Sequence, residues 1–228
     1  MKIAIHHEWD ISFEEARTIQ SLLCHKLKLN SSTSADQLKY IAAVDVSFNR
    51  FSSRLFGAAI LYRVADHSVI ETVVGERNVD FPYVPGYLSF REIPVLLPLL
   101  QELTREPDVI LCDGQGIAHP RGLGLASHLG VILDKPTIGC AKSVLVGSYR
   151  EPGEEKGSYS SLEYEGKVVG AALRTRSGVK PVYVSPGHRI TLELAIDCVL
   201  RVSPKYRIPE PLRLAHRAVN DYRREKTP

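Results

Sequence analysis

Cysteine is scarce in this chain, and its spacing argues against the sites that cysteine usually builds. The 228 residues include four cysteines, at positions 24, 112, 140 and 198, and no two form a Cys-x-x-Cys pair. A structural zinc site needs closely spaced ligands, which this pattern does not offer. Cys112 and Cys140 stand in apolar runs. The pattern predicts buried free thiols in a reducing compartment.

Long apolar runs and a strong excess of one charge are also missing. No run approaches the ~20 residues that a membrane span requires. The N-terminal residues lack the apolar core of a signal peptide, so we expect a cytoplasmic protein without a membrane segment. The formal net charge is only +3, so nucleic-acid binding would depend on local clusters of basic side chains.

Three common catalytic signatures are missing as well. The chain has no Gly-x-Ser-x-Gly elbow, no His-Glu-x-x-His helix and no Gly-x-x-x-x-Gly-Lys-Ser/Thr phosphate loop. Its composition is that of an ordinary globular protein, with 44% hydrophobic and 24% charged residues. Because no internal repeat or linker interrupts it, we expect one domain over residues 1–228.

The order of the predicted elements indicates an α/β fold with a mixed central sheet. Three strand-like runs are joined by short turns, at residues 40–48, 55–62 and 68–74. They predict an antiparallel meander. Helices and strands then alternate, at residues 88–104, 107–113, 122–133 and 136–140. This alternation predicts parallel crossover units, with helices flanking the sheet.

The remaining segments complete this outline. Ser12 and Glu15 form a capping box that predicts a helix to about residue 28, followed by a polar loop over 30–36. Pro94 and Pro98 should kink or restart the helix over 88–104. Later in the chain we expect a hairpin, a short strand and two helices, at residues 162–173, 182–184, 191–202 and 210–224.

Three acids stand where such a fold can bring them together. Asp45 interrupts an apolar strand that we expect at the centre of the sheet, and Asp113 ends the run over 107–113. Neighbouring strands lie roughly 5 Å apart, so these two carboxylates can share one site. Glu92, early in the intervening helix, can be a third. Clustered carboxylates repel one another unless a cation holds them, and oxygen ligands suit Mg²⁺ or Mn²⁺.

Each of these residues also has a simpler interpretation. Asp45 and Asp113 can be hydrogen-bonded turn formers, and Glu92 a solvated helix residue. Lys142 follows the strand over 136–140, where it can meet either a phosphate or solvent. His216 lies in the basic last helix, where a surface histidine is the ordinary case. The prediction of a site therefore depends on the convergence of the acids.

Several long motifs make a resemblance specific. Residues 81–92 read Phe-Pro-Tyr-Val-Pro-Gly-Tyr-Leu-Ser-Phe-Arg-Glu, and residues 113–121 read Asp-Gly-Gln-Gly-Ile-Ala-His-Pro-Arg. Shorter motifs stand at residues 44–48, 136–143 and 187–189. Together they resemble the signature motifs of the endonuclease V family, in the family's order and over nearly the whole chain. Cys112 stands where valine is commoner in that family, a small apolar change.

The resemblance implies a fold and an activity. The fold would be ribonuclease H-like. The activity would be Mg²⁺-dependent, with Mn²⁺ able to substitute, and would act on DNA that contains deoxyinosine or other deaminated bases. The enzyme would hydrolyse the second phosphodiester bond on the 3′ side of the lesion and leave 3′-hydroxyl and 5′-phosphate ends. We expect it to act as a monomer.

The resemblance also implies roles for individual residues. Asp45, Glu92 and Asp113 match the metal-binding carboxylates, and with Lys142 and His216 they form the expected catalytic set. Pro82, Tyr83, Val84 and Pro85 match a wedge that separates the strands. The other expected lesion-binding residues are Gly86, Leu88, Arg91, Gly114, His119 and Gly124.

The wedge has a physical rationale, although the same residues taken alone would only predict a rigid turn. Prolines fix the backbone, so that an aromatic tip can enter a base stack without first being ordered. A purine must leave the duplex before its hydrogen-bonding edge can be read. Glycine at position 86 permits close approach of the backbone to that base.

Two alternatives for the activity remain. Pro85 resembles bacterial and archaeal members of the family, whereas animal relatives, which resemble RNA-directed enzymes, tend to have serine there. This favours DNA, with inosine-containing RNA as the alternative substrate. A protein that binds inosine without cutting is the other possibility, and the presence of all three acids argues against it.

Overall fold

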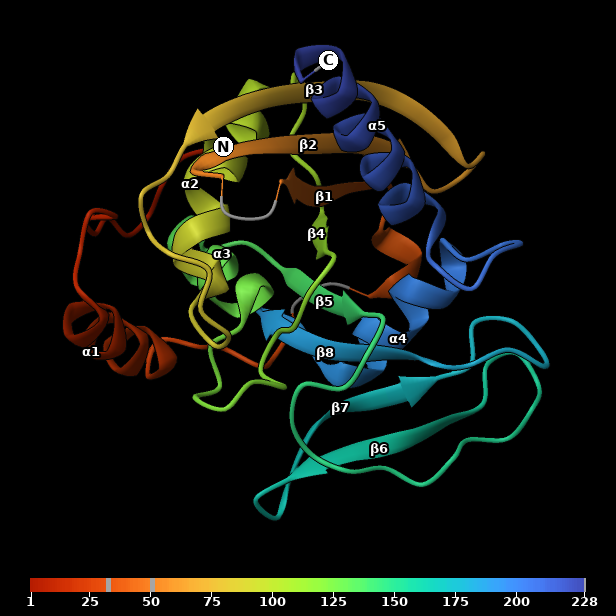
Figure 1. Cartoon of the computed structure of the whole chain (residues 1–228). Coiled ribbons are helices and arrows are strands. Elements are labelled where there is room, and N and C mark those ends of the chain that lie inside the picture. The colour runs from red at the N-terminus through yellow and green to blue at the C-terminus, as the bar shows by residue number, and fades with distance from the viewer. Residues whose placement is uncertain (32–33, 50–51, 228) are drawn as a thin grey trace.

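A single eight-stranded sheet forms the centre of the protein. The computed structural model describes residues 1–31, 34–49 and 52–227 (Figure 1). The strands are β1 (Tyr40–Phe48), β2 (Arg54–Arg63), β3 (Ser68–Asn78), β4 (Val109–Cys112), β5 (Thr137–Ala141), β6 (Tyr159–Tyr164), β7 (Lys167–Leu173) and β8 (Val182–His188). Their order across the sheet is β3-β2-β1-β4-β5-β8-β7-β6.

The predicted mixed sheet is confirmed. β1, β2 and β3 form the antiparallel meander, and β4 and β5 pair in parallel with β1 and with each other. The hairpin of β6 and β7 is present too. The sheet also extends beyond β5, because β8 pairs with it antiparallel and joins the hairpin to the sheet.

Helices cover both faces of this sheet. They are α1 (Phe13–Cys24), α2 (Leu88–Glu102), α3 (Leu125–Leu133), α4 (Leu192–Arg201) and α5 (Glu210–Lys226). On one face α2 and α3 pack over the sheet, while α4 and α5 cover the other face (Figure 1). Alternate residues of β1 serve the two cores: Ala42 and Val44 face α2, whereas Ile41 and Ala43 face α4 and α5.

Of the two outcomes predicted for the prolines in α2, a kink or a restart of the helix, the restart does not occur. The helix runs from Leu88 to Glu102 with Pro94 and Pro98 inside it. Proline at position 98 lacks the N–H that would bond to the carbonyl of Pro94. The Arg77 guanidinium donates to that carbonyl instead, at 3.4 Å. The buried apolar side chains of α2 also hold it against the sheet, so the lost backbone bonds do not end the helix.

The first helix is shorter than predicted. It begins after the Ser12 capping box, as expected, but ends at Cys24 instead of about residue 28. Beyond the helix, the Lys28 carbonyl accepts a hydrogen bond at 2.6 Å from the N–H of Arg189, the residue after β8. In the predicted loop over 30–36, residues 32 and 33 lie outside the described residues. A short 3-10 helix, η1 (Ala35–Gln37), closes that segment.

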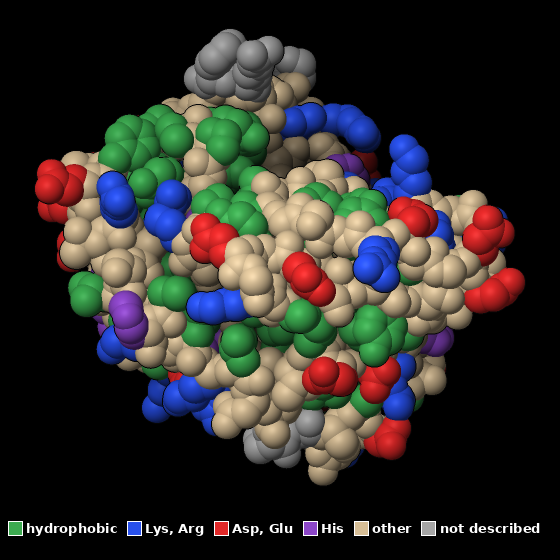
Figure 2. All heavy atoms as spheres, turned by 90° about the horizontal axis from the view of Figure 1, so that it is seen from below, with side chains coloured by type: hydrophobic (Ala, Val, Ile, Leu, Met, Phe, Trp, Pro, Cys, Tyr) green, Lys and Arg blue, Asp and Glu red, His purple; other side chains and the backbone are tan. Residues whose placement is uncertain are grey.

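The prediction of free thiols is confirmed. All four cysteines are free, and Cys112, Cys140 and Cys198 are buried. Within the described part of the chain, no helix is long and apolar enough to cross a membrane. On the face shown in Figure 2, acidic and basic side chains are interspersed among hydrophobic ones.

Candidate active site

Two of the predicted acids lie side by side, one within β1 and one directly after the parallel strand β4. The register of β1 and β4 pairs Val44 with Cys112, so the next residues are Asp45 and Asp113. The Asp113 N–H lies 3.4 Å from the Val44 carbonyl oxygen. The side-chain oxygens of Asp45 and Asp113 come within 4.8 Å of each other. Neighbouring strands thus deliver both carboxylates to one point.

Glu92 joins them from α2, and we call Asp45, Glu92 and Asp113 the acidic cluster. Burial, followed by the charges of Asp45 and Asp113, raises the pKa of Glu92 to about 8. Burial and the nearby Asp113 also raise the pKa of Asp45. Both shifts have the direction expected when carboxylates share a site shielded from water. The three acids therefore repel one another.

Two cationic or basic groups face this cluster. The Lys142 ammonium pairs with Asp113. The His216 Nδ1–H donates to Asp45 Oδ2 at 2.7 Å. His216 reaches Asp45 because that side chain follows Ile41 and Ala43 onto the sheet face that α5 covers. All five predicted catalytic residues therefore lie together.

Three side chains at this site lie close enough together to bind one metal ion. Asp45, Asp113 and His216 each offer a ligand atom, and the three atoms lie within 4.8 Å of one another. Carboxylate and imidazole groups are both common metal ligands. A possible ligand set therefore includes His216, which the sequence interpretation placed in the catalytic set but not among the metal ligands.

A pocket of about 480 Å³ opens beside the acidic cluster. It is lined by Glu92, Asp113 and Lys142 and by seven of the predicted lesion-binding residues: Tyr83, Pro85, Gly86, Leu88, Gly114, His119 and Gly124. The structure thus brings most of the predicted lesion-binding set to the predicted catalytic set. Pro82 and Arg91 line a different pocket, and Val84 lines neither.

The turn at Gly86 is held by several donors. Gly86 has a φ of +83°, which glycine adopts without strain. Its carbonyl accepts hydrogen bonds from Gln20 at 2.9 Å, from His119 at 3.1 Å and from Arg121. Burial and the neighbouring Arg121 lower the pKa of His119 to about 4, so this imidazole is neutral. His119 therefore positions the turn through a neutral N–H.

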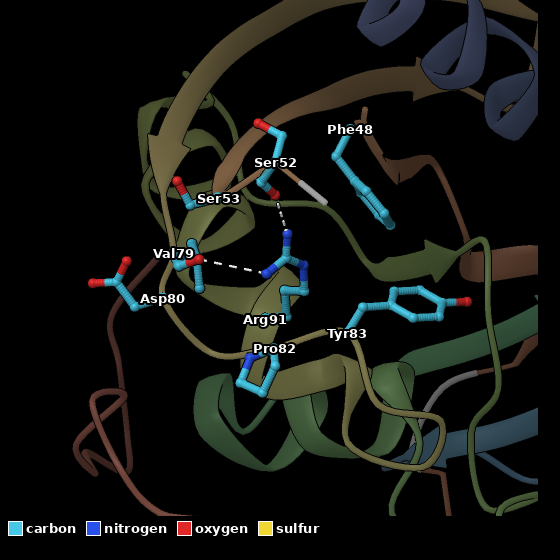
Figure 3. Close-up of a pocket in the computed structure, with 8 residues that line it drawn as sticks. All are labelled: Phe48, Ser52, Ser53, Val79, Asp80, Pro82, Tyr83 and Arg91. Atoms are coloured by element: carbon cyan, nitrogen blue, oxygen red, sulfur yellow. Dashed lines mark hydrogen bonds between the residues drawn. The ribbon is translucent and has the colours of Figure 1, made fainter. Parts of the chain in front are cut away.

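Arg91 anchors the predicted wedge from beneath. It is only 5% exposed, and its guanidinium donates to the carbonyls of Ser52 and Val79 (Figure 3). It also donates to the carbonyl of Phe81 at 2.6 Å. Tyr83, by contrast, is 58% exposed at the tip of the segment. Arg91 therefore ties the segment to the chain before β2, while Tyr83 projects from it.

Sequence reasoning missed two residues that adjoin this site. Asn220 lies one turn after His216 on α5, and its Oδ1 accepts from the Ser47 hydroxyl at 2.8 Å. The i, i+4 spacing from His216 was the available signal. Gln115 donates to the Ser143 carbonyl at 3.1 Å, which joins the loop that carries Asp113 to the loop after Lys142. No spacing in the sequence indicates that contact.

Comparison with solved structures establishes the fold. The crystal structure of endonuclease V from Streptomyces avermitilis is similar with a TM-score of 0.92 and 41% identity, over 100% of both chains. The Argonaute of A. aeolicus is similar with a TM-score of 0.53 and 13% identity, over 81% of this chain and 28% of that one. At this identity the likeness concerns the fold alone, and it confirms a ribonuclease H-like fold.

One structure with bound nucleic acid is also similar. It is an endonuclease V from Ciona intestinalis in complex with a 23mer DNA that contains an inosine followed by a ribo-adenosine. The TM-score is 0.84 at 28% identity, over 94% of this chain and 99% of that one.

Sequence comparison identifies the family. The family model described as Endonuclease V matches residues 21–217. The endonuclease V of Trichormus variabilis is 48% identical over 221 residues, which cover 97% of this chain and 100% of that protein. Because the match extends over nearly the full length of both proteins, this chain belongs to the endonuclease V family, whose members hydrolyse phosphodiester bonds.

Proposed function

We propose that this chain is a Mg²⁺-dependent repair endonuclease that recognises deoxyinosine in DNA. It cuts the second phosphodiester bond on the 3′ side of the lesion and leaves 3′-hydroxyl and 5′-phosphate ends. The observation that carries the proposal is the position of Tyr83, which lines the same pocket as Glu92 and Asp113. An aromatic wedge beside a cluster of acids joins base displacement to phosphodiester hydrolysis. The inosine-containing DNA bound by the Ciona relative supports the choice of substrate.

The donor chemistry fits a hard divalent cation. Asp45, Glu92 and Asp113 offer carboxylate oxygens, and the raised pKa of Asp45 and Glu92 reflects negative charge that a cation would offset. Oxygen donors favour Mg²⁺, with Mn²⁺ as a substitute. When bound, such an ion lowers the pKa of a coordinated water and stabilises charge on the leaving oxygen.

The chain's own side chains supply the remaining functions. Lys142 carries a positive charge to the rim of the pocket, where it attracts the phosphate of the substrate. The His216 N–H holds the Asp45 carboxylate in one orientation. Tyr83 enters the base stack, and Gly86 and Leu88 bring backbone groups close to the displaced base. The whole chain acts as one catalytic domain and as a cytoplasmic monomer.

A nicking assay tests the proposal. A duplex with one deoxyinosine is incubated with Mg²⁺, and we expect a single cut at the second bond on the 3′ side. The variant Asp45→Ala should abolish nicking and keep most of the affinity for the lesion. If the wild-type protein binds this duplex in Mg²⁺ and leaves it intact, the chain is a binding protein and the proposal is wrong.

Inosine-containing RNA is the second candidate substrate. The relative's bound strand carries a ribonucleotide directly after the inosine, so ribose at that position is compatible with binding in that protein. Cleavage rates on DNA and RNA strands of matched sequence decide between the two. We expect faster cutting of DNA, and faster cutting of RNA would reverse the assignment.

A further inference from the structure

A second pocket lies on the other side of Tyr83. Its volume is about 820 Å³, within the ~300–1,000 Å³ range of small-molecule pockets. Phe48, Ser52, Ser53, Val79, Asp80, Pro82, Tyr83 and Arg91 line it (Figure 3). Tyr83 lines both this pocket, which we call the Phe48 pocket, and the pocket beside the acidic cluster. The wedge residue thus separates two cavities.

The Phe48 pocket has an aromatic wall. The rings of Phe48 and Tyr83 have centroids 5.8 Å apart and are inclined at 51° to each other, so they do not stack face to face. The guanidinium of Arg91 lies 5.3 Å from the Phe48 ring centroid and supports that ring. Flat aromatic faces beside an opening are the surfaces on which nucleobases stack, whatever their sequence.

The charge beneath this pocket also suits a nucleotide. Arg91 is 5% exposed, and in the described part of the chain it makes no ion pair with an acid. Its Nε has no hydrogen-bond partner among the described residues. A buried cation that is bonded only to carbonyls is stabilised by a negatively charged ligand. A nucleotide carries such a charge next to its aromatic base.

From this geometry we propose that the Phe48 pocket receives the base that stood opposite the lesion. When the lesion base leaves the duplex, the base opposite it is left unpaired. Because Tyr83 lies between two cavities, each of the two bases can enter one of them. The Ser53 hydroxyl and the Asp80 carboxylate stand at the exposed rim, where they can meet the base's hydrogen-bonding edge. This inference rests on the proposed function, because it assumes that Tyr83 separates the strands.

The test removes the opposite base and the aromatic wall in turn. Wild type and Phe48→Ala are titrated by fluorescence anisotropy with deoxyinosine opposite cytosine, with deoxyinosine opposite an abasic site, and with the single strand. EDTA is present, so no strand is cut. We expect Phe48→Ala to lose about 10-fold in affinity for the first duplex only, since stacking on one aromatic side chain is worth roughly this much.

Two further variants keep the result interpretable. Phe48→Leu retains an apolar side chain for packing and loses the aromatic face, so it should reproduce the loss if Phe48→Ala folds poorly. Tyr159→Ala removes a 54% exposed aromatic ring from β6, at the far edge of the sheet, and should change none of the affinities.

Other outcomes overturn the inference. An equal loss on both duplexes would mean that Phe48 only supports the wedge. An equal loss on the single strand would place a base of the lesion strand in the pocket. No loss at all would leave the pocket without a role in binding. The proposed function fails separately, if wild type does not distinguish deoxyinosine from deoxyguanosine strands.

Discussion

Two clusters of titratable side chains adjoin the first turns of α2, and they are built in opposite ways. One is a histidine chain, in which the Ser89 hydroxyl donates to His128 at 2.9 Å and His128 donates to His7 at 2.9 Å. His7 in turn donates to the Glu8 carbonyl at 2.7 Å. This arrangement of protons satisfies every ring nitrogen with both rings neutral. Burial accordingly lowers the pKa of His7 and of His128.

The members of the acidic cluster do not hydrogen-bond to one another in this way. Its three carboxylates are all acceptors when ionised, so they can only repel one another. Lys142 and His216 offset part of the charge from the exposed side. The histidine chain is stabilised by hydrogen bonds within the protein, whereas the acidic cluster requires a bound ion or substrate to offset its charge. This contrast distinguishes residues that stabilise the fold from residues that act on a substrate.

Replacing Glu92 should have the largest effect and should move activity and stability in opposite directions. We expect Glu92→Gln to lower nicking about 100-fold or more, because the amide is a weaker ligand for the metal. In EDTA the same variant should be more stable by about 1–2 kcal/mol, because repulsion with Asp45 and Asp113 is relieved. Urea unfolding and a nicking assay measure the two effects. If Glu92→Gln lost both activity and stability, the acidic cluster would not differ from the histidine chain in this respect.

Replacing His128 should lower stability and leave activity nearly unchanged. Its side chain is fully buried and packs edge-on against Phe90 at 4.8 Å. We expect His128→Ala to lower the free energy of unfolding by about 2–4 kcal/mol, since it leaves a cavity and two unpaired groups. Nicking per folded molecule should change little. His6→Ala is the control, because His6 is exposed and directly precedes His7 of the histidine chain, and it should leave stability unchanged.

The two clusters should also respond oppositely to pH. Glu92 has a pKa of about 8 when folded and 4.5 as its ordinary value, so acidification through this window stabilises the protein. His7 and His128, the histidines of the other cluster, have folded pKa values below 6.5, so they cost stability once the pH falls below 6.5. Each group contributes up to about 1.4 kcal/mol per pH unit.

In the wild-type protein these two contributions partly cancel. Glu92→Gln removes the stabilising one, so in EDTA its unfolding free energy should fall more steeply than that of the wild type between about pH 8 and pH 5. Urea titrations at several pH values measure the slopes. Identical slopes would contradict the assignment of Glu92.

The smallest effect is expected at His216. This side chain is 58% exposed and makes one hydrogen bond to Asp45, whose other carboxylate oxygen accepts from the Val46 N–H at 2.9 Å. We expect His216→Ala to lower nicking about 10-fold and to leave the thermal midpoint nearly unchanged. His25→Ala, an exposed histidine at the end of α1, is the matched control. A loss as large as that of Glu92→Gln would make His216 an equal member of the site.

Local sequence patterns predicted the acids well. Asp45 interrupts an apolar strand and Asp113 ends another, and the pairing of those neighbouring strands was enough to bring the two acids together. Predictions that depended on side-chain direction were harder. The residue type at Arg91 does not reveal that its guanidinium turns inward to three carbonyls, and Pro98 does not reveal that Arg77 replaces the missing donor in α2.

The sequence by itself determined which chemical groups this protein has and which strands and helices carry them, because apolar periodicity and turn residues act over short distances. Only the tertiary structure decided their partners. His216 meets Asp45 across 171 positions of sequence, once α5 has packed on the face to which β1 turns that carboxylate. Tyr83 likewise lies between two pockets only because the end of β1, the segment after β3 and the start of α2 converge around it. Such contacts arise from packing between distant segments, which no local pattern records.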